Sequence, residues 1–174
     1  GLLDHVSEFE PVSQRLRPPT QRVSPRARWL WRIEGIGSMM SILAAQGIWW
    51  WRDPASPQPL QWWVLAATVV TETAYLVVMP QWRYRVHRWE VTPEAVYTQT
   101  GWFNQERRIA PIVRIQTVDL ARGPVAQLLG LASVRVTTAS SAGPLRIHGL
   151  DHALAVSLVE QLTELTVSDP GDAT

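Results

Sequence analysis

The sequence predicts a membrane α-helical hairpin joined to a small α+β domain. Two long apolar runs, each bordered by tryptophan, follow one another in the first half of the 174-residue chain. Beyond them the pattern changes to short alternating stretches separated by turn residues, which is typical of β-strands. A last amphipathic stretch predicts one C-terminal helix. The length leaves room for one ordinary domain beside the hairpin.

Composition excludes several classes of function. The formal net charge of +1 gives no general attraction to nucleic acid, so we expect no nucleic-acid partner. Because the chain has no cysteine, disulfides, thiolate metal sites and cysteine nucleophiles are excluded. Residues 1–28 are polar and rich in arginine and proline, which predicts a flexible cytoplasmic segment rather than a signal peptide.

The two apolar runs define the predicted hairpin, residues 29–80. Its spans cover about residues 33–51 and 60–79, and each is close to the roughly 20 residues that a helix needs to cross the hydrocarbon core. The connection between them contains three prolines and predicts a short turn. Pro80 should end the second helix. A buried hairpin in a soluble protein is the alternative, but it would need a larger domain to cover it.

Arginine beside the spans predicts the orientation. Six arginines precede the first span and Arg83, Arg85 and Arg88 follow the second, while the turn has one. Since basic loops remain on the cytoplasmic side, we expect a multi-pass protein of the cell (inner) membrane with both termini in the cytoplasm. These three arginines, with Trp82 and Trp89, are the predicted membrane-surface contacts, because indoles collect at the interface and arginine is attracted to anionic lipid.

Glu72 is the one acid well inside a predicted span, where an ionised carboxylate is unfavourable. Antiparallel pairing about the turn places it opposite Met39, between Ser38 and Ser41. Glu72, Ser38 and Ser41 therefore form a predicted intramembrane polar site. We favour a protonated carboxyl that joins the two helices or contacts another copy over a proton or ion relay, because one acid makes no pathway.

Residues 81–166 are predicted to form one domain. A short helix is expected at 125–129 after Gly123-Pro124, and Asp151 is the expected N-cap of a final helix with one apolar stripe. Residues 167–174 should be disordered. The expected strands lie at 84–91, 95–100, 106–109, 113–120, 133–138 and 145–148.

A set of short motifs follows the two spans in order. They are Arg83-Tyr84-Arg85-Val86, Glu94-Ala95-Val96-Tyr97, Arg107-Arg108-Ile109, Arg114-Ile115-Gln116-Thr117-Val118, Gly130-Leu131-Ala132 and Gly149-Leu150-Asp151. Over about residues 30–165 this order resembles the bacterial pleckstrin-homology-like (PH-like), membrane-flanked domain family, to which the YdbS-like membrane proteins belong. The resemblance implies a bent antiparallel β-barrel or sandwich capped by a C-terminal α-helix. Members of that family have no established enzymatic activity.

The sequence offers no catalytic set. It lacks a nucleophile beside a base, paired carboxylates and a glycine-rich phosphate loop, and His148 and His152 beside Asp151 make a weak metal site. We therefore expect no enzyme, no cofactor and no metal. Eukaryotic pleckstrin-homology domains hold phosphoinositides with basic residues around the first hairpin loop, whereas the loop here is Thr92-Pro93-Glu94. Specific phosphoinositide binding is therefore not expected.

Arg107, Arg108, Arg114 and Gln116 form the remaining polar group. Arg108 and Arg114 either pair with Glu106 or Asp119 within the sheet, which we favour, or the group forms an exposed surface for a partner chain.

The sequence thus predicts a membrane-anchored binding or assembly module at the cytoplasmic face of the bacterial inner membrane, without catalysis. The lipid bilayer is one expected partner, and the other is a second copy of the chain or another membrane or envelope protein. The alternative is an accessory subunit of a transporter or envelope enzyme that contributes the Glu72 carboxyl to a shared intramembrane site.

Overall fold

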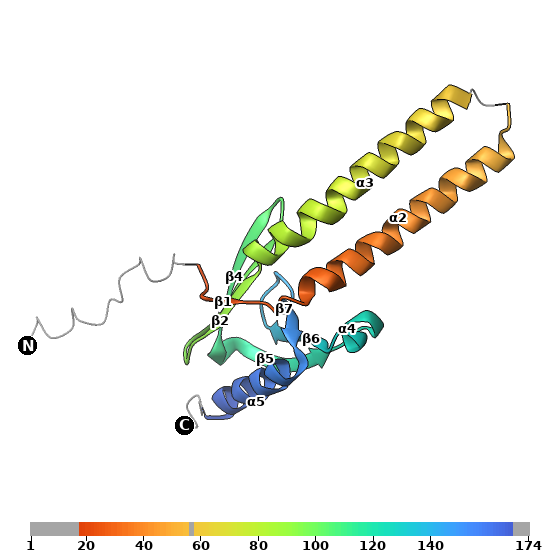
Figure 1. Ribbon diagram of the computed structural model, residues 1–174. Helices are drawn as coiled ribbons and strands as arrows, with labels where there is room; N and C mark the ends of the chain where they lie inside the picture. The colour runs from red at the N-terminus through yellow and green to blue at the C-terminus, as the bar shows by residue number, and fades with distance from the viewer. Residues whose placement is uncertain (1–17, 56–57, 169–174) are drawn as a thin grey trace, which may run out of the picture.

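The computed structural model describes residues 18–55 and 58–168. Two long helices form an arm, and a small β-rich domain lies at one end of it (Figure 1). The expectations for residues 1–17 and 169–174 lie outside the described residues. The prediction of disorder from residue 167 is wrong for two residues, because the final helix extends to Ser168.

The arm consists of α2 (Ala27–Arg52) and α3 (Gln58–Val86), which lie side by side and antiparallel (Figure 1). A glycine allows their close approach near the domain: a Cβ on Gly35 would lie 2.5 Å from Leu76 Cδ2. Further along, the side-chain amide of Gln46 donates a hydrogen bond to the hydroxyl of Thr68 in the facing helix. The predicted helical hairpin is therefore present as a pair of packed helices.

Pro80 does not end the second helix, contrary to expectation. The helix continues through Pro80 to Val86, and Met79 and Pro80 are buried. Proline removes one backbone donor and crowds the preceding turn, yet packing on both sides can hold such a helix together. The predicted strand at residues 84–91 is consequently wrong in its first half, and β2 is limited to Arg88–Val91.

The described part of the N-terminal segment is ordered, so the prediction of a flexible segment up to residue 28 is wrong for residues 18–28. The short strand β1 (Gln21–Arg22) pairs antiparallel with β2. Directly after it, the Ser24 hydroxyl donates to Asp151 Oδ1 at 2.9 Å, and the Ser24 N–H donates to the Gly149 carbonyl at 2.8 Å. These bonds attach the start of the arm to the end of strand β7 (Leu145–Asp151).

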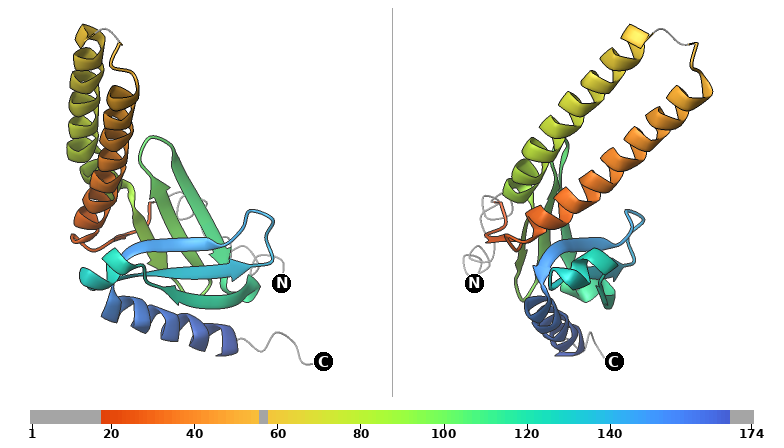
Figure 2. Two further views of the ribbon diagram at one scale, coloured as in Figure 1. Left: turned by 90° about the vertical axis from the view of Figure 1, so that its right-hand side faces the viewer. Right: turned by 45° about the vertical axis from the view of Figure 1, so that its right-hand side comes forward.

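The domain contains two antiparallel sheets, and α5 (His152–Ser168) packs against the second sheet (Figure 2). The first sheet has the order β1-β2-β3-β4 and the second the order β5-β6-β7. A 3-10 turn (Ile112–Arg114) connects the sheets, and α4 (Pro124–Leu128) precedes β6. The remaining strands are β3 (Ala95–Gly101), β4 (Gln105–Pro111), β5 (Ile115–Ala121), β6 (Leu131–Thr138) and β7 (Leu145–Asp151). Two antiparallel sheets with a C-terminal helix agree with the expected PH-like α+β fold.

One hydrophobic core joins the domain to the base of the arm. Val96, Val134 and Leu162 come from the two sheets and α5, and Trp31 and Met79 enter the same cluster from α2 and α3. Trp31 is only 2% exposed, and burying so large a side chain stabilises a fold by a few kcal/mol, with about 25 cal/mol per Å² of apolar surface. The arm is thus anchored by its base rather than tethered by a linker.

Candidate functional site

Three groups stack where the arm enters the domain. The guanidinium of Arg83 lies over the Trp31 ring, with Cζ 4.6 Å from the ring centroid, and the His87 ring lies 5.1 Å from Trp31. His87 Nδ1 donates a hydrogen bond to the Arg83 carbonyl at 2.9 Å. Burial, followed by the nearby charge of Arg83, lowers the pKa of His87 to about 4. The ring is therefore neutral at physiological pH.

Two of these groups, Arg83 and His87, border a cavity of about 420 Å³ between the end of α3 and the two sheets. We call it the junction pocket. Arg83 and His87 line it from the arm side, Arg108 from β4, and Arg146 and His148 from β7. Burial, then the charges of Arg83 and Arg146, lowers the pKa of His148, so both histidines are uncharged and the three arginines determine the sign of the pocket. Hydroxyl groups and one carboxylate complete the polar lining: Thr98, Thr100 and Glu106.

The hydrogen-bond donors of Arg108 are occupied by other groups of the protein. Its Nη1 and Nη2 donate to the carbonyls of Pro144 and Gly143 at 2.8 and 2.6 Å, and its Nε lies 3.8 Å from Glu106 Oε1. The favoured interpretation, pairing with Glu106 within the sheet, agrees with this geometry. Arg108 also fixes the loop that closes one side of the junction pocket.

The rest of that predicted group is divided between the two sheets. Arg107 lies on β4, whereas Arg114 is in the 3-10 turn and Gln116 is on β5. All three side chains are exposed. The structure therefore does not assemble Arg107, Arg108, Arg114 and Gln116 into one surface.

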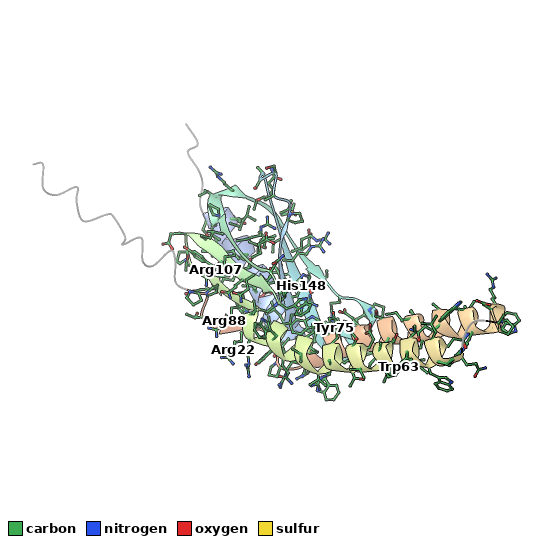
Figure 3. All side chains as sticks on the ribbon, turned by 90° about the horizontal axis from the view of Figure 1, so that it is seen from above. Arg22, Trp63, Tyr75, Arg88, Arg107 and His148 are labelled. Carbon is green, nitrogen blue, oxygen red and sulfur yellow. The ribbon has the colours of Figure 1, made fainter. Side chains whose placement is uncertain are left out.

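Arg107 instead belongs to a basic row on the first sheet. Arg22 lies opposite Arg88, Arg88 opposite Gln99, and Gln99 opposite Arg107. Residues opposite one another project to the same face of a sheet, and Figure 3 shows Arg22, Arg88 and Arg107 on the same side of the domain. The sequence did not predict a strand at Arg22, because a two-residue strand that follows prolines shows no periodicity.

The predicted membrane-surface contacts separate into two groups. Trp82 and Arg85 are exposed on the last turns of α3, and Arg88 starts β2. Trp89, in contrast, is 4% exposed and belongs to the core, so its prediction as a membrane contact is wrong. Alternation along β2 directs Trp89 inward because Arg88 faces outward.

The predicted intramembrane polar site is present in part. Glu72 and Ser38 line a cavity of about 270 Å³ between the helices, but Ser41 does not belong to it, because its hydroxyl bonds the Gly37 carbonyl of its own helix at 2.9 Å. Ser41 lies three residues further along α2 than Ser38, about 4.5 Å farther from the domain, and therefore beyond the end of this cavity. The cavity also contains Glu34 and Arg83, which sequence pairing about the turn did not identify.

The turn between β3 and β4 carries two aromatic side chains to the arm. Trp102 packs edge-on against Tyr75 of α3 with 5.8 Å between ring centroids, and Phe103 beside it is 86% exposed. Gly101, with φ of +107°, makes the turn tight: a Cβ there would lie 1.8 Å from the Asn104 carbonyl oxygen. Because Tyr75 belongs to the predicted second span, this aromatic tip lies beside the apolar part of the arm.

Among residues 18–55 and 58–168, one helix is long and apolar enough to cross a membrane. It is α3, and only 6% of its apolar stretch is buried. In the same described residues, no group of histidine and acidic side chains is arranged to hold a metal ion.

A domain of two antiparallel sheets and a C-terminal helix, carried on an apolar helical arm, defines a PH-like domain of a membrane-associated protein. The chain belongs to the bacterial PH domain family, whose model matches residues 40–166. It is 34% identical over 79 residues to the UPF0699 transmembrane protein YdbS of Bacillus subtilis (strain 168). This confirms the family resemblance seen in the sequence. The match covers 45% of this chain and 46% of YdbS, so the chain spans about half the length of that relative. No solved structure gave a match to this chain.

Proposed function

We propose that the chain is a membrane-anchored, non-catalytic binding or assembly module, with its PH-like domain at the cytoplasmic face of the bacterial inner membrane. One observation carries this proposal: apolar side chains are buried in the domain at the base of the arm, but they are exposed along the rest of it. Met40, Val70 and Trp63 are examples, at 63%, 68% and 76% exposed. An apolar surface of this extent is typical of a membrane or partner contact.

Both helices would cross the bilayer together. At about 1.5 Å per residue, the predicted span at residues 33–51 of α2 extends over about 28 Å, close to the hydrocarbon core of about 30 Å. Since α2 lies beside α3, a bilayer that surrounds α3 also surrounds α2. The strongly polar Gln46 supports this arrangement, because its amide is paired with Thr68 inside the arm. The excess of arginine near the domain supports a cytoplasmic position for both termini.

Assembly with a second copy or with another envelope protein is the proposed role. The edge strand β4 supports it, since an unpaired strand edge can add a strand from a partner. Ile109 on that strand is 52% exposed, beside Arg107. The lipid-facing sides of α2 and α3 offer a second contact surface within the membrane.

Topology is tested with reporters on the full chain. Alkaline phosphatase fused after Thr174 should be inactive and a fluorescent protein there should fluoresce, whereas phosphatase inserted in the turn after Pro54 should be active. Alkaline carbonate should leave the protein in membranes. An active phosphatase after Thr174, or release by carbonate, would refute the membrane hairpin.

Purification in mild detergent with mass measurement by light scattering tests assembly. A stable homo-oligomer supports self-assembly, and a monomer without a bound protein would refute the assembly role.

The second candidate is an accessory subunit with an intramembrane carboxyl. The cavity that brings Glu72, Glu34 and Ser38 together supports it. A stoichiometric larger partner in the purified sample, together with loss of that partner's activity in Glu72→Gln, would favour this role. Unchanged activity with the complex intact would show that the carboxylate charge is not used.

A further inference from the structure

The junction pocket has the charge of an anion site. Arg83, Arg108 and Arg146 face it against one carboxylate, Glu106. Arg108 is bound to Glu106 and to two loop carbonyls, which leaves Arg83 and Arg146 as the groups able to receive a ligand. Within residues 18–55 and 58–168, neither Arg83 nor Arg146 has an acidic partner at ion-pair distance. The charge of Glu34 acts on Arg83 from the neighbouring cavity between the helices, but the two carboxyl-containing residues there, Glu34 and Glu72, do not line the junction pocket. Two guanidinium groups that face one cavity without an ion pair in it favour a phosphate, which accepts hydrogen bonds from arginine in a bidentate manner.

The basic surface continues beyond this pocket. Arg146 and His148 also line a neighbouring cavity of about 280 Å³, together with Arg122 and Arg135. Arg135 lies directly opposite Arg146 on the adjacent strand, and like charges at such positions repel each other. A bound anion would relieve this repulsion.

The pocket also lies at the depth of lipid headgroups, an argument that rests on the proposed membrane crossing of α3. Arg83 follows the expected end of the span at residue 79 by four residues, or about 6 Å along the helix. The headgroup layer extends about 5 to 8 Å beyond the hydrocarbon core. Trp102 forms part of the pocket wall and packs on Tyr75 inside the span, so one side of the pocket adjoins the bilayer (Figure 3 labels Tyr75 and His148 at this junction).

We propose that the junction pocket binds the phosphate of an anionic phospholipid headgroup through Arg83 and Arg146, while the aromatic tip of Trp102 and Phe103 enters the bilayer beside it. The neutral histidines and the hydroxyls of Thr98 and Thr100 surround the ligand without adding charge. The basic residues come from α3 and β7, so a bound headgroup would join the arm to the second sheet.

The full chain in mild detergent is titrated with dioctanoyl-phosphatidylglycerol, dioctanoyl-phosphatidylcholine and sodium phosphate, and binding is followed by calorimetry. We expect phosphatidylglycerol to bind at least about tenfold more tightly than phosphatidylcholine or phosphate. Arg146→Gln should weaken phosphatidylglycerol binding about tenfold, because one charged hydrogen-bond donor is lost. Arg114→Gln removes the same charge from an exposed position of the 3-10 turn, outside the pocket and away from the predicted membrane-surface contacts, and should stay within twofold.

Arg83→Gln should weaken phosphatidylglycerol binding as much as Arg146→Gln does. Because Arg83 also packs on Trp31, its replacement can disturb the fold. Arg146 is exposed, so Arg146→Gln tests lipid binding without this disturbance. Equal binding of the two lipids, or an equal loss in Arg114→Gln and Arg146→Gln, would overturn the proposal. If sodium phosphate bound as tightly as phosphatidylglycerol, the ligand of the pocket would be a free phosphate rather than a lipid headgroup, and the proposal would be wrong. Since these titrations need no bilayer, their failure is distinct from failure of the topology reporters.

Discussion

The base of the arm and its distal part are made of the same two helices but lie in different surroundings. Near the domain, Trp31 and Met79 are buried in the common core, whereas Trp63, near the turn, is 76% exposed. Figure 3 shows Trp63 far from the domain, near the other end of the arm. The same residue type therefore stabilises the fold at one end and contacts the surroundings at the other, and apolar character alone does not distinguish the two roles.

The largest expected effect follows from truncating a tryptophan at the base. Trp31→Ala should destabilise the protein by about 3 to 5 kcal/mol, because it empties a core position that also supports Arg83 and His87. Trp63→Ala is the matched control and should change stability by less than about 0.5 kcal/mol. Thermal unfolding in detergent measures both. Equal shifts in melting temperature would show that the tryptophans at the two ends of the arm contribute equally to stability, contrary to this interpretation.

The attachment of the N-terminal segment is tested at a glycine. Gly149 has φ of +71°, and a Cβ there would lie 2.7 Å from Ala27 Cβ, so Gly149→Ala combines backbone strain with a clash against the start of α2. We expect a loss of about 2 to 4 kcal/mol. Gly143→Ala has a similar φ of +79° but open space, and it should lose only about 1 kcal/mol. If the two variants were equally stable, the packing of Ala27 on this strand would not matter.

Acidic pH should destabilise the fold at the base of the arm. Burial lowers the pKa of His87 from 6.5 to about 4 in the folded protein, so the unfolded chain binds the proton more tightly. Stability from this group is complete above pH 6.5 and is lost as the pH falls to about 4, with a loss of about 2 kcal/mol at pH 5. The lowered pKa of His148 acts in the same direction.

Melting temperatures between pH 7.5 and 5 measure this effect. His87→Asn should flatten the profile, whereas His152→Asn, at an exposed position, should not. A wild-type profile without a decline toward pH 5 would contradict the buried, neutral state of His87.

The smallest effect on stability accompanies a probe of membrane depth. Because the chain contains no cysteine, single cysteines can carry spin labels at chosen positions. A label at Phe103→Cys should be more accessible to oxygen than to a water-soluble nickel complex in bilayers, since the aromatic tip lies beside Tyr75. A label at Glu94→Cys, in the loop at the other end of β3, should show the reverse. Identical accessibility would place the tip in water.

Local patterns in the sequence predicted the regular parts of this fold. Alternation and turn residues located β3 through β7, although the strand expected at 113–120 begins in the 3-10 turn, and β6 and β7 extend beyond the expected 133–138 and 145–148. The apolar stripe identified α5, because this helix buries one face against the core. The two long helices were predicted from apolar runs alone. The run past Pro80 was misread, since the alternating residues 84–87 fit a strand locally, and only the buried surroundings of Pro80 maintain the helix.

The candidate site could be predicted from local sequence patterns only to a small extent. Arg83, Arg108 and Arg146 come from three distant segments, and no spacing in the sequence relates them. Trp89 resembled the interfacial tryptophans around it, and only the pairing of β2 showed that it faces the core. Glu72 was predicted to lie opposite Met39, between Ser38 and Ser41, and it lines the same cavity as Ser38 because an antiparallel hairpin with a short turn has a definite register.

The bond between Ser24 and Asp151 joins residues 127 positions apart. Strand β1, directly before Ser24, pairs with β2, so the contacts of residues 21–24 form only after residues 88–151 have been synthesised. Both apolar helices are synthesised in the interval, before the two sheets of the domain can assemble. With the membrane crossing proposed above, insertion of the helices would precede folding of the domain, and docking of residues 21–24 would be a late step of folding.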